Sequence, residues 1–394
     1  QTLEAAGGEA DFGGPVVQFS LGAVRENVAG SFELRAEKVP FPSIQKLIDP
    51  ESIPKLKGSI DLVANGKVGF KPWFLSSSYS VSSPELSFFI SETMRPYLPF
   101  RLKELSVRGE AKWSKERNFT IENGTIRADG FEAIYGFDFP RDGRMSGTWN
   151  ATINRLAGVF PDGDGISGVG KITGGLAGEK GSPQALLQIG LDPFQYRSHP
   201  PAQASGDVVL EKGRTTLRNF RLTVGKGTMQ LNAQIPGAAS MESLAVNGQF
   251  TDFDLGWISD VTARRFPAWG GVNGIGSGAV NLSGDTTAPS GTVTLESSSA
   301  SWKGEEFDGI DADVALEDGA VVLHKIAVRG PGLTADVRGR VANNEFRGFQ
   351  IDATRFPLSV VSFPSYLLPL VSHADAHVSL EGMTSDPVVR GDFR

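Results

Sequence analysis

The chain has 394 residues, more than a single hydrophobic core usually holds. Its 40% hydrophobic and 21% charged residues are typical of a folded chain and exclude extended disorder. The net charge of −7 disfavours nucleic-acid binding, which needs a basic surface, and the absence of cysteine excludes disulfides, thiol catalysis and cysteine-ligated metals. With 48 glycines and 23 prolines, the chain is predicted to contain many short elements joined by tight turns.

The chain contains no predicted membrane span. Its longest apolar stretch, residues 356–371, is interrupted by three prolines and three serines. The N-terminus lacks the basic and then apolar layout of a signal peptide. Strand-like sequence begins by Val16, and the chain stops inside another strand pattern at 392–394. We therefore expect a segment of a longer protein, with any membrane anchor outside it.

Most of the predicted elements are strands, because apolar and polar residues alternate with a period of two. In chain order, the clearest predicted strands are 31–36, 119–126, 131–139, 147–153, 217–224, 228–235, 248–253, 291–295, 322–328, 333–341, 348–353 and 388–393. Short, proline-interrupted amphipathic helices are predicted at 42–56, 254–266 and 358–370. At roughly one strand per 11 residues, we expect about 30–35 strands, joined as antiparallel hairpins.

A repeat of about 100 residues organises these strands. Each copy begins with an alternating strand, continues through a segment rich in proline and aromatic residues, and returns to glycine-started strands after a turn that ends in proline. The predicted boundaries are the end of a preceding repeat at 1–28, complete repeats at 29–145, 146–242 and 243–346, and a truncated repeat at 347–394. We expect these repeats to form one continuous, elongated β-structure.

Each predicted strand has one apolar face. In 228–235, for example, Met229, Leu231 and Ile235 share a face, and polar residues occupy the other. An antiparallel sheet built in this way either closes into a sandwich or solenoid core, or curls into a trough with an apolar groove. Alternation alone leaves both architectures open.

The repeat resembles the AsmA-like family, which includes AsmA, TamB and YhdP. The likeness rests on the Gly-x-φ-x-φ strands (φ, apolar), on the Leu-x-Gly turns that lead through proline into a strand at 282–293 and 380–393, and on the paired strands around Gly-x-Gly at 225–227 and 330–332. It covers residues 29–394. The resemblance implies an all-β fold with a few short helices, in which a long, twisted antiparallel sheet curls into a trough.

The resemblance also implies a function in the bacterial periplasm. Family members are anchored in the inner membrane and carry phospholipids toward the outer membrane, and the TamB branch acts with an outer-membrane barrel protein. Neither catalytic residues nor a cofactor are implied. Two other interpretations remain open: a scaffold or chaperone for outer-membrane protein assembly that binds by β-strand addition, and an extracellular β-solenoid, either an adhesin or a carbohydrate-active enzyme.

The residues expected to line a lipid groove are the apolar members of the alternating strands. They are Ile60, Leu62, Ile121, Phe137, Phe139, Trp149, Ile153, Phe220, Leu222, Val224, Met229, Leu231, Ile235, Val293, Leu295, Ile326, Val328, Leu333, Val337, Val341, Phe349 and Ile351.

Groups of polar residues that could form a metal site or a catalytic site are only weakly indicated. His373, Asp375 and His377 share one face of a predicted strand and are possible metal ligands, but one strand rarely supplies a complete coordination geometry. Such residues equally suit the solvent-facing side of a strand. Only four histidines occur, and none lies in a context that indicates a catalytic pair. We therefore expect no enzyme site and no metal site.

Overall fold

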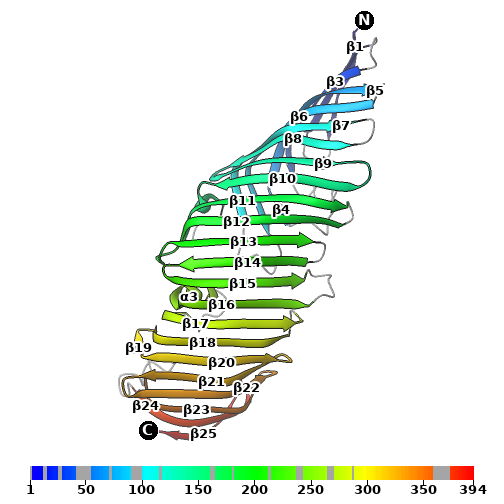
Figure 1. Ribbon diagram of the computed structural model, residues 1–394. Helices are drawn as coiled ribbons and strands as arrows, with labels where there is room; N and C mark the ends of the chain where they lie inside the picture. The colour runs from blue at the N-terminus through cyan, green and yellow to red at the C-terminus, as the bar shows by residue number, and fades with distance from the viewer. Residues whose placement is uncertain are drawn as a thin grey trace. The chain divides into compact units, whose positions relative to one another are not determined.

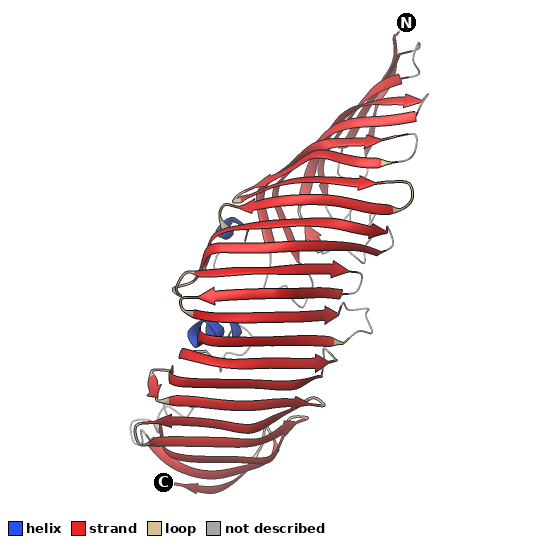
Figure 2. Ribbon diagram, in the orientation of Figure 1, coloured by secondary structure: helices blue, strands red, loops and turns tan. Residues whose placement is uncertain are grey.

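The protein is almost entirely β-structure (Figure 2). The computed structural model describes residues 2–11, 16–24, 29–40, 55–70, 73–89, 100–114, 118–159, 165–179, 182–211, 214–236, 243–263, 270–285, 288–357 and 373–394. The chain divides into unit 1, residues 1–201 with 207–212, and unit 2, residues 202–206 with 213–394. Strand β13 (Ala202–Glu211) contributes residues to both units.

Unit 1 is an antiparallel sheet whose strands pair in chain order, apart from one short insertion. Its elements are β1 (Thr2–Asp11), β2 (Val16–Val24), β3 (Ala29–Pro40), β4 (Lys55–Lys57), β5 (Ser59–Phe70), β6 (Trp73–Phe89), β7 (Phe100–Trp113), β8 (Phe119–Ala128), β9 (Phe131–Phe139), β10 (Arg144–Ile153), α2 (Leu156–Val159), β11 (Ile166–Glu179) and β12 (Ser182–Tyr196). Strand β3 pairs with β5. Strand β4, which lies between them in the sequence, pairs instead with residues 87–89 at the end of β6.

Unit 2 repeats this arrangement, with its strands in chain order in Figure 1. Its elements are β14 (Arg214–Val224), β15 (Gly227–Pro236), β16 (Leu244–Asp254), α3 (Leu255–Thr262), β17 (Val272–Gly284), β18 (Pro289–Trp302), β19 (Glu305–Phe307), β20 (Gly309–Glu317), β21 (Ala320–Gly330), β22 (Leu333–Ala342), β23 (Glu345–Pro357), β24 (His373–Met383) and β25 (Val388–Phe393). Strand β18 pairs with β20, and β19 caps one end of β18.

The predicted fold class is confirmed: the structure is nearly all β, antiparallel and not closed on itself. The described residues form 25 strands, against the 30–35 expected for the whole chain. Individual strands are longer than the sequence estimate assumed, and β6 alone has 17 residues. Several of them pass through β-bulges, which interrupt the alternation without ending the strand.

Helices are few and short. The helix predicted at 254–266 is α3, which begins at Leu255 because the carboxylate of Asp254 caps it, accepting hydrogen bonds from the backbone N–H groups of Gly256 (2.8 Å) and Trp257 (3.3 Å). The helix predicted at 42–56 is contradicted at its end, where β4 begins at Lys55; residues 41–54 and the helix predicted at 358–370 lie outside the described residues. In the described part of the chain, no helix has the length and apolarity that a bilayer crossing requires.

The Asp254 cap gives a testable contribution to stability. Replacing Asp254 with alanine removes the carboxylate that accepts these two hydrogen bonds. The N–H groups of Gly256 and Trp257 then lose this acceptor, so we expect the free energy of unfolding to fall by about 1 kcal/mol. Asp254→Ser keeps a side-chain oxygen and should lose less. Guanidinium unfolding followed by tryptophan fluorescence measures both variants. Equal losses for alanine and serine would contradict the assignment of this energy to the cap.

Some features recur in both units. Strands β10 and β16 are each followed by a short helix, α2 and α3 respectively. Ser83 in β6 and Ser297 in β18 are both 3% exposed, and each donates a 2.7 Å hydrogen bond to a backbone carbonyl of the preceding strand segment, Ser59 and Ile275. The exact boundaries of the repeats stay a prediction, and the division into two units falls inside the repeat predicted at 146–242.

Candidate functional site: an open apolar face

One face of each sheet is mostly apolar. In unit 2, cross-strand register aligns one apolar or glycine residue from each of eleven consecutive strands, a set that we call the central row. The central row is Leu222, Met229, Phe250, Gly278, Leu295, Ala312, Ile326, Val337, Ile351, Val378 and Gly391. No polar residue interrupts it. We call this side of the sheet the apolar face.

Unit 1 has an apolar face of the same construction. One aligned row across nine strands consists of Ala36, Leu62, Val81, Val107, Ile126, Ala133, Ala151, Ile172 and Ile189. Register places every residue predicted to line a groove on the apolar face of its own unit. That lipid lies on these residues stays a prediction.

Exposure along the strands differs between their two ends. At one end, which we call the sealed margin, the apolar residues are buried, with Phe253 at 0%, Val224 at 3% and Leu333 at 7% exposed. At the opposite end, the open margin, Ile235 is 45% and Val321 is 37% exposed. Between the margins most large side chains are half-buried, including Leu231, Val337 and Ile351. A closed core would bury the middle of each strand instead.

The sealed margin is built by short elements that fold over the strand ends. Helix α3 packs against β17, where a Cβ atom on Gly276 would lie 2.9 Å from the Leu255 side chain. Further along unit 2, Phe307 of β19 and Leu333 form a buried cluster against Trp302, Val328 and Phe356. In unit 1, Leu156 of α2 is 1% exposed. These contacts bury several of the large side chains among the described residues.

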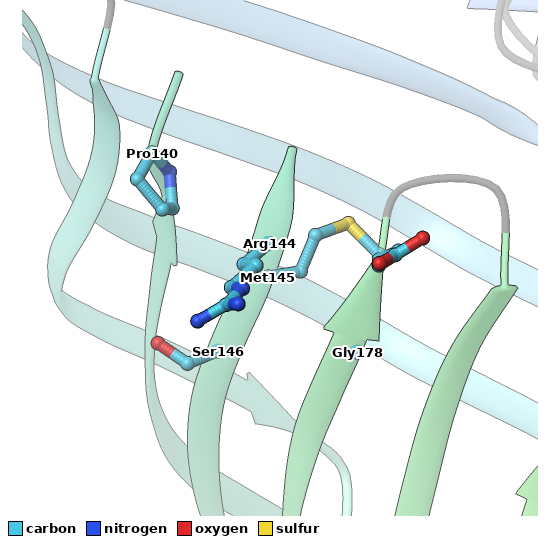
Figure 3. Close-up of a pocket in the computed structure, with 6 residues that line it drawn as sticks. Pro140, Arg144, Met145, Ser146 and Gly178 are labelled. Atoms are coloured by element: carbon cyan, nitrogen blue, oxygen red, sulfur yellow. The ribbon is translucent and has the colours of Figure 1, made fainter. Parts of the chain in front are cut away.

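The open margin contains only shallow hollows among the described residues. One of about 350 Å³ lies where β9, β10 and β11 end (Figure 3). Pro140 and Met145 line it, and the Met145 thioether extends toward β11. The charged residues Arg144 and Glu179 also belong to the lining. The hollow has neither the enclosure nor the convergent polar groups of a small-molecule active site.

Aromatic rings lie flat on the apolar face because glycines stand opposite them. Phe137 faces Gly147 across β9 and β10, and a Cβ atom built on Gly147 would lie 2.1 Å from the Phe137 ring. Trp149 covers Gly174 in the same way, at 2.6 Å. A side chain at either glycine would lift the ring off the sheet. The glycines thus let the aromatic rings lie close against the backbone. We call this surface of rings and glycines the floor of the apolar face.

Two tyrosine hydroxyls meet on the apolar face of unit 1. The hydroxyl oxygens of Tyr79 (β6) and Tyr135 (β9) lie 2.7 Å apart, and both rings are half-buried on the apolar face of unit 1. Burial, and after it the hydrogen bond with Tyr79, raises the pKa of the Tyr135 phenol well above its ordinary value. The Tyr135 phenol therefore stays protonated and neutral at physiological pH.

The opposite face of each sheet is polar and solvated. Along β15, Gln230 and Asn232 are exposed, and their side chains bond across strands to the Gln249 amide (3.3 Å) and the Asn219 backbone N–H (2.8 Å). These side-chain bonds stabilise the ladder on its wet side without forming a pocket. The apolar face is therefore the distinctive surface of each sheet.

The histidine side chains of strand β24 lie on this polar face and do not form a metal site. His373, Asp375 and His377 are all exposed. Asp375 accepts a 2.7 Å hydrogen bond from the Arg355 backbone N–H, and His377 pairs with Asp352 on the neighbouring strand. The described residues contain no group of three or more side chains arranged to hold a metal ion.

Sequence reasoning missed several members of the apolar face. Phe250, Val280 and Val378 are not among the predicted lining residues, although alternation in their own strands places them on the apolar face. Tyr79 was missed for a different reason: its partner Tyr135 lies 56 positions away, and no local pattern joins them. Alternation through Leu75, Tyr79 and Val81 would have placed Tyr79 on the apolar face, but not beside Tyr135.

Comparison with known proteins leaves the family open. The chain matches neither a model of a known protein family nor any of the curated proteins.

Proposed function

We propose that this chain carries phospholipids by holding their acyl chains on its apolar face, as the periplasmic part of a bacterial envelope protein related to the AsmA-like family. The observation that carries the proposal is the central row: eleven strands of unit 2 contribute only apolar residues or glycine, and most of its large side chains are half-buried rather than buried. A soluble protein rarely leaves so long an apolar surface without an occupant.

Acyl chains are an occupant of matching chemistry. Each methylene removed from water gains about 0.8 kcal/mol, so even partial coverage of two chains stabilises a bound lipid. With strands about 4.8 Å apart, the eleven strands of unit 2 extend for about 48 Å, enough for more than one lipid. Neighbouring positions on the floor are chemically alike, which favours movement of lipid between near-equivalent sites over tight binding at one of them.

Mass spectrometry of an organic extract from the purified protein tests this proposal. We expect phospholipid in at least equimolar amount, retained after a detergent-free wash and absent from an unrelated β-protein purified from the same cells. A folded protein that contains no lipid and takes up none from vesicles would refute lipid carriage. If such a protein instead captured β-strand peptides, the scaffold interpretation would replace it.

A further inference from the structure

The rings of Tyr79 and Tyr135 lie over two glycines. Tyr79 stands opposite Gly109 in register, and Tyr135 stands opposite Gly124. A Cβ atom on Gly109 would lie 2.5 Å from the Tyr79 hydroxyl and 3.2 Å from the Gly124 Cα, and one on Gly124 would lie 2.6 Å from the Tyr135 ring. The two rings therefore lie flat across the intervening strands, and their hydroxyls meet above the glycines.

Packing does not require these hydroxyls. At other aromatic–glycine contacts on the apolar face the ring is phenylalanine or tryptophan, as at Phe137 on Gly147 and Phe250 on Gly278. Most neighbours of the pair are apolar, with Val81 and Val107 on one side and Phe137 on the other. The polar neighbour Ser77, two positions from Tyr79, donates its hydroxyl to the backbone carbonyl of Ser78 (3.1 Å). A hydroxyl placed here costs desolvation free energy unless it is hydrogen-bonded.

The mutual hydrogen bond satisfies only part of the pair's capacity. Two phenols carry two donor protons, and a bond between them uses one. The second proton remains to donate to an acceptor over the apolar face, since both rings are only half-buried. The ligand that this arrangement fits is apolar over most of its length and has one oxygen acceptor.

The position of the pair along the strand matches the length of an acyl chain. Tyr135 lies four positions from Phe131, where β9 begins at the β8–β9 turn, and four residues of strand span about 14 Å. One leaflet of a bilayer's hydrocarbon is about 15 Å thick. A chain whose carbonyl carbon lay at the pair could therefore extend its tail to the sealed margin.

We propose that the Tyr79–Tyr135 pair is a hydrogen-bonding subsite for the carbonyl or carboxylate oxygen at the head of an acyl chain. The inference rests on the proposed function and adds a fixed position on unit 1 at which the head of an acyl chain is held. Hydrocarbon passes over the pair without a specific interaction, whereas an ester or acid group accepts the available phenolic proton. The subsite sets the register of a lipid on unit 1.

Infrared spectroscopy of bound, carbonyl-labelled lipid tests the subsite directly. The intact protein is loaded with ¹³C-carboxyl hexadecanoic acid or with phosphatidylglycerol labelled at its ester carbonyls. In the unmodified protein we expect a carbonyl or carboxylate band shifted by hydrogen bonding. In the Tyr79→Phe/Tyr135→Phe variant the shifted component should disappear, and affinity should fall about fivefold to tenfold, as the loss of one hydrogen bond predicts. A shift with only one probe identifies the acid or the ester as its source.

Two further variants separate the subsite from general effects. Gly124→Ala keeps both hydroxyls but displaces the Tyr135 ring, so it should also lose the shifted band. Tyr196→Phe removes a hydroxyl at the sealed margin of the same unit and should leave the band unchanged. Circular dichroism confirms that each variant is folded.

The outcomes distinguish the subsite from the function on which it rests. Lipid that binds with the same affinity and the same carbonyl band in the double phenylalanine variant would overturn the subsite and leave lipid carriage standing. An unmodified protein that binds neither probe, and no phospholipid from vesicles, would overturn both.

Discussion

Replacing Leu231 with aspartate should strip lipid from the protein. Leu231 lies at the middle of β15, half-buried, with its side chain against Gly248 of β16. A carboxylate there must stay hydrated, so it keeps acyl methylenes away from the floor around it. Displacing four methylenes costs about 3 kcal/mol, or roughly a hundredfold in affinity at that position. The phospholipid-to-protein ratio, measured by mass spectrometry of an organic extract, should fall accordingly.

The adjacent residue provides a matched control. Asn232→Asp introduces the same charge one position along the strand, on the exposed polar face, and still offers an oxygen to the Asn219 backbone N–H. It should leave the lipid content unchanged, as should Leu231→Ala, which keeps the floor apolar. Equal lipid loss from Leu231→Asp and Asn232→Asp, with both variants folded, would mean that charge alone and not the apolar face governs lipid content.

Two phenylalanines on β16 should respond very differently to truncation. Phe253 is fully buried at the sealed margin, with its ring 5.9 Å from that of Trp257 in α3. Phe253→Ala therefore leaves a cavity and should lower the free energy of unfolding by about 3–5 kcal/mol. Phe250 lies half-buried on the open floor. Phe250→Ala loses only part of its burial and should cost about 1 kcal/mol.

Denaturant unfolding of the delipidated protein measures both losses, since bound lipid would stabilise the folded state of either variant. The comparison tests the openness of the apolar face itself. If a second layer covered the floor, Phe250 would be a core residue and its truncation would cost as much as that of Phe253. Similar losses would thus contradict an open trough whatever the lipid measurements gave.

The sequence alone predicts much of this architecture, because alternation is a local property. Met229, Leu231 and Ile235 identify the apolar side of β15, and register then carries that side across the sheet. Alternation does not reveal where a strand stops: bulges at Asn219 in β14 and near Asp252 in β16 interrupt the pattern but not the strand. An estimate of one strand per 11 residues takes no account of such long, bulged strands.

The candidate site was predictable only in part. That the apolar face exists follows from composition and period, but whether anything covers it depends on contacts between distant elements. Lys55 and Leu56 belong to a strand at the end of β6 rather than to the predicted helix, because pairing with residues some 30 positions away overrides local preference. The Tyr79–Tyr135 pair likewise depends on the register of four strands.

The aromatic–glycine contacts have a consequence for folding fidelity. In a sheet of many similar strands, a slip of two residues leaves every apolar side chain on the correct face, so hydrophobic burial cannot detect the error. The rings can: Phe137 rests on Gly147 only in the native alignment, and a two-residue slip would set it against Met145 or Trp149. Each aromatic–glycine contact therefore favours the native register of the two strands that it joins. If these glycines were replaced, we expect the strands to pair in a mixture of registers.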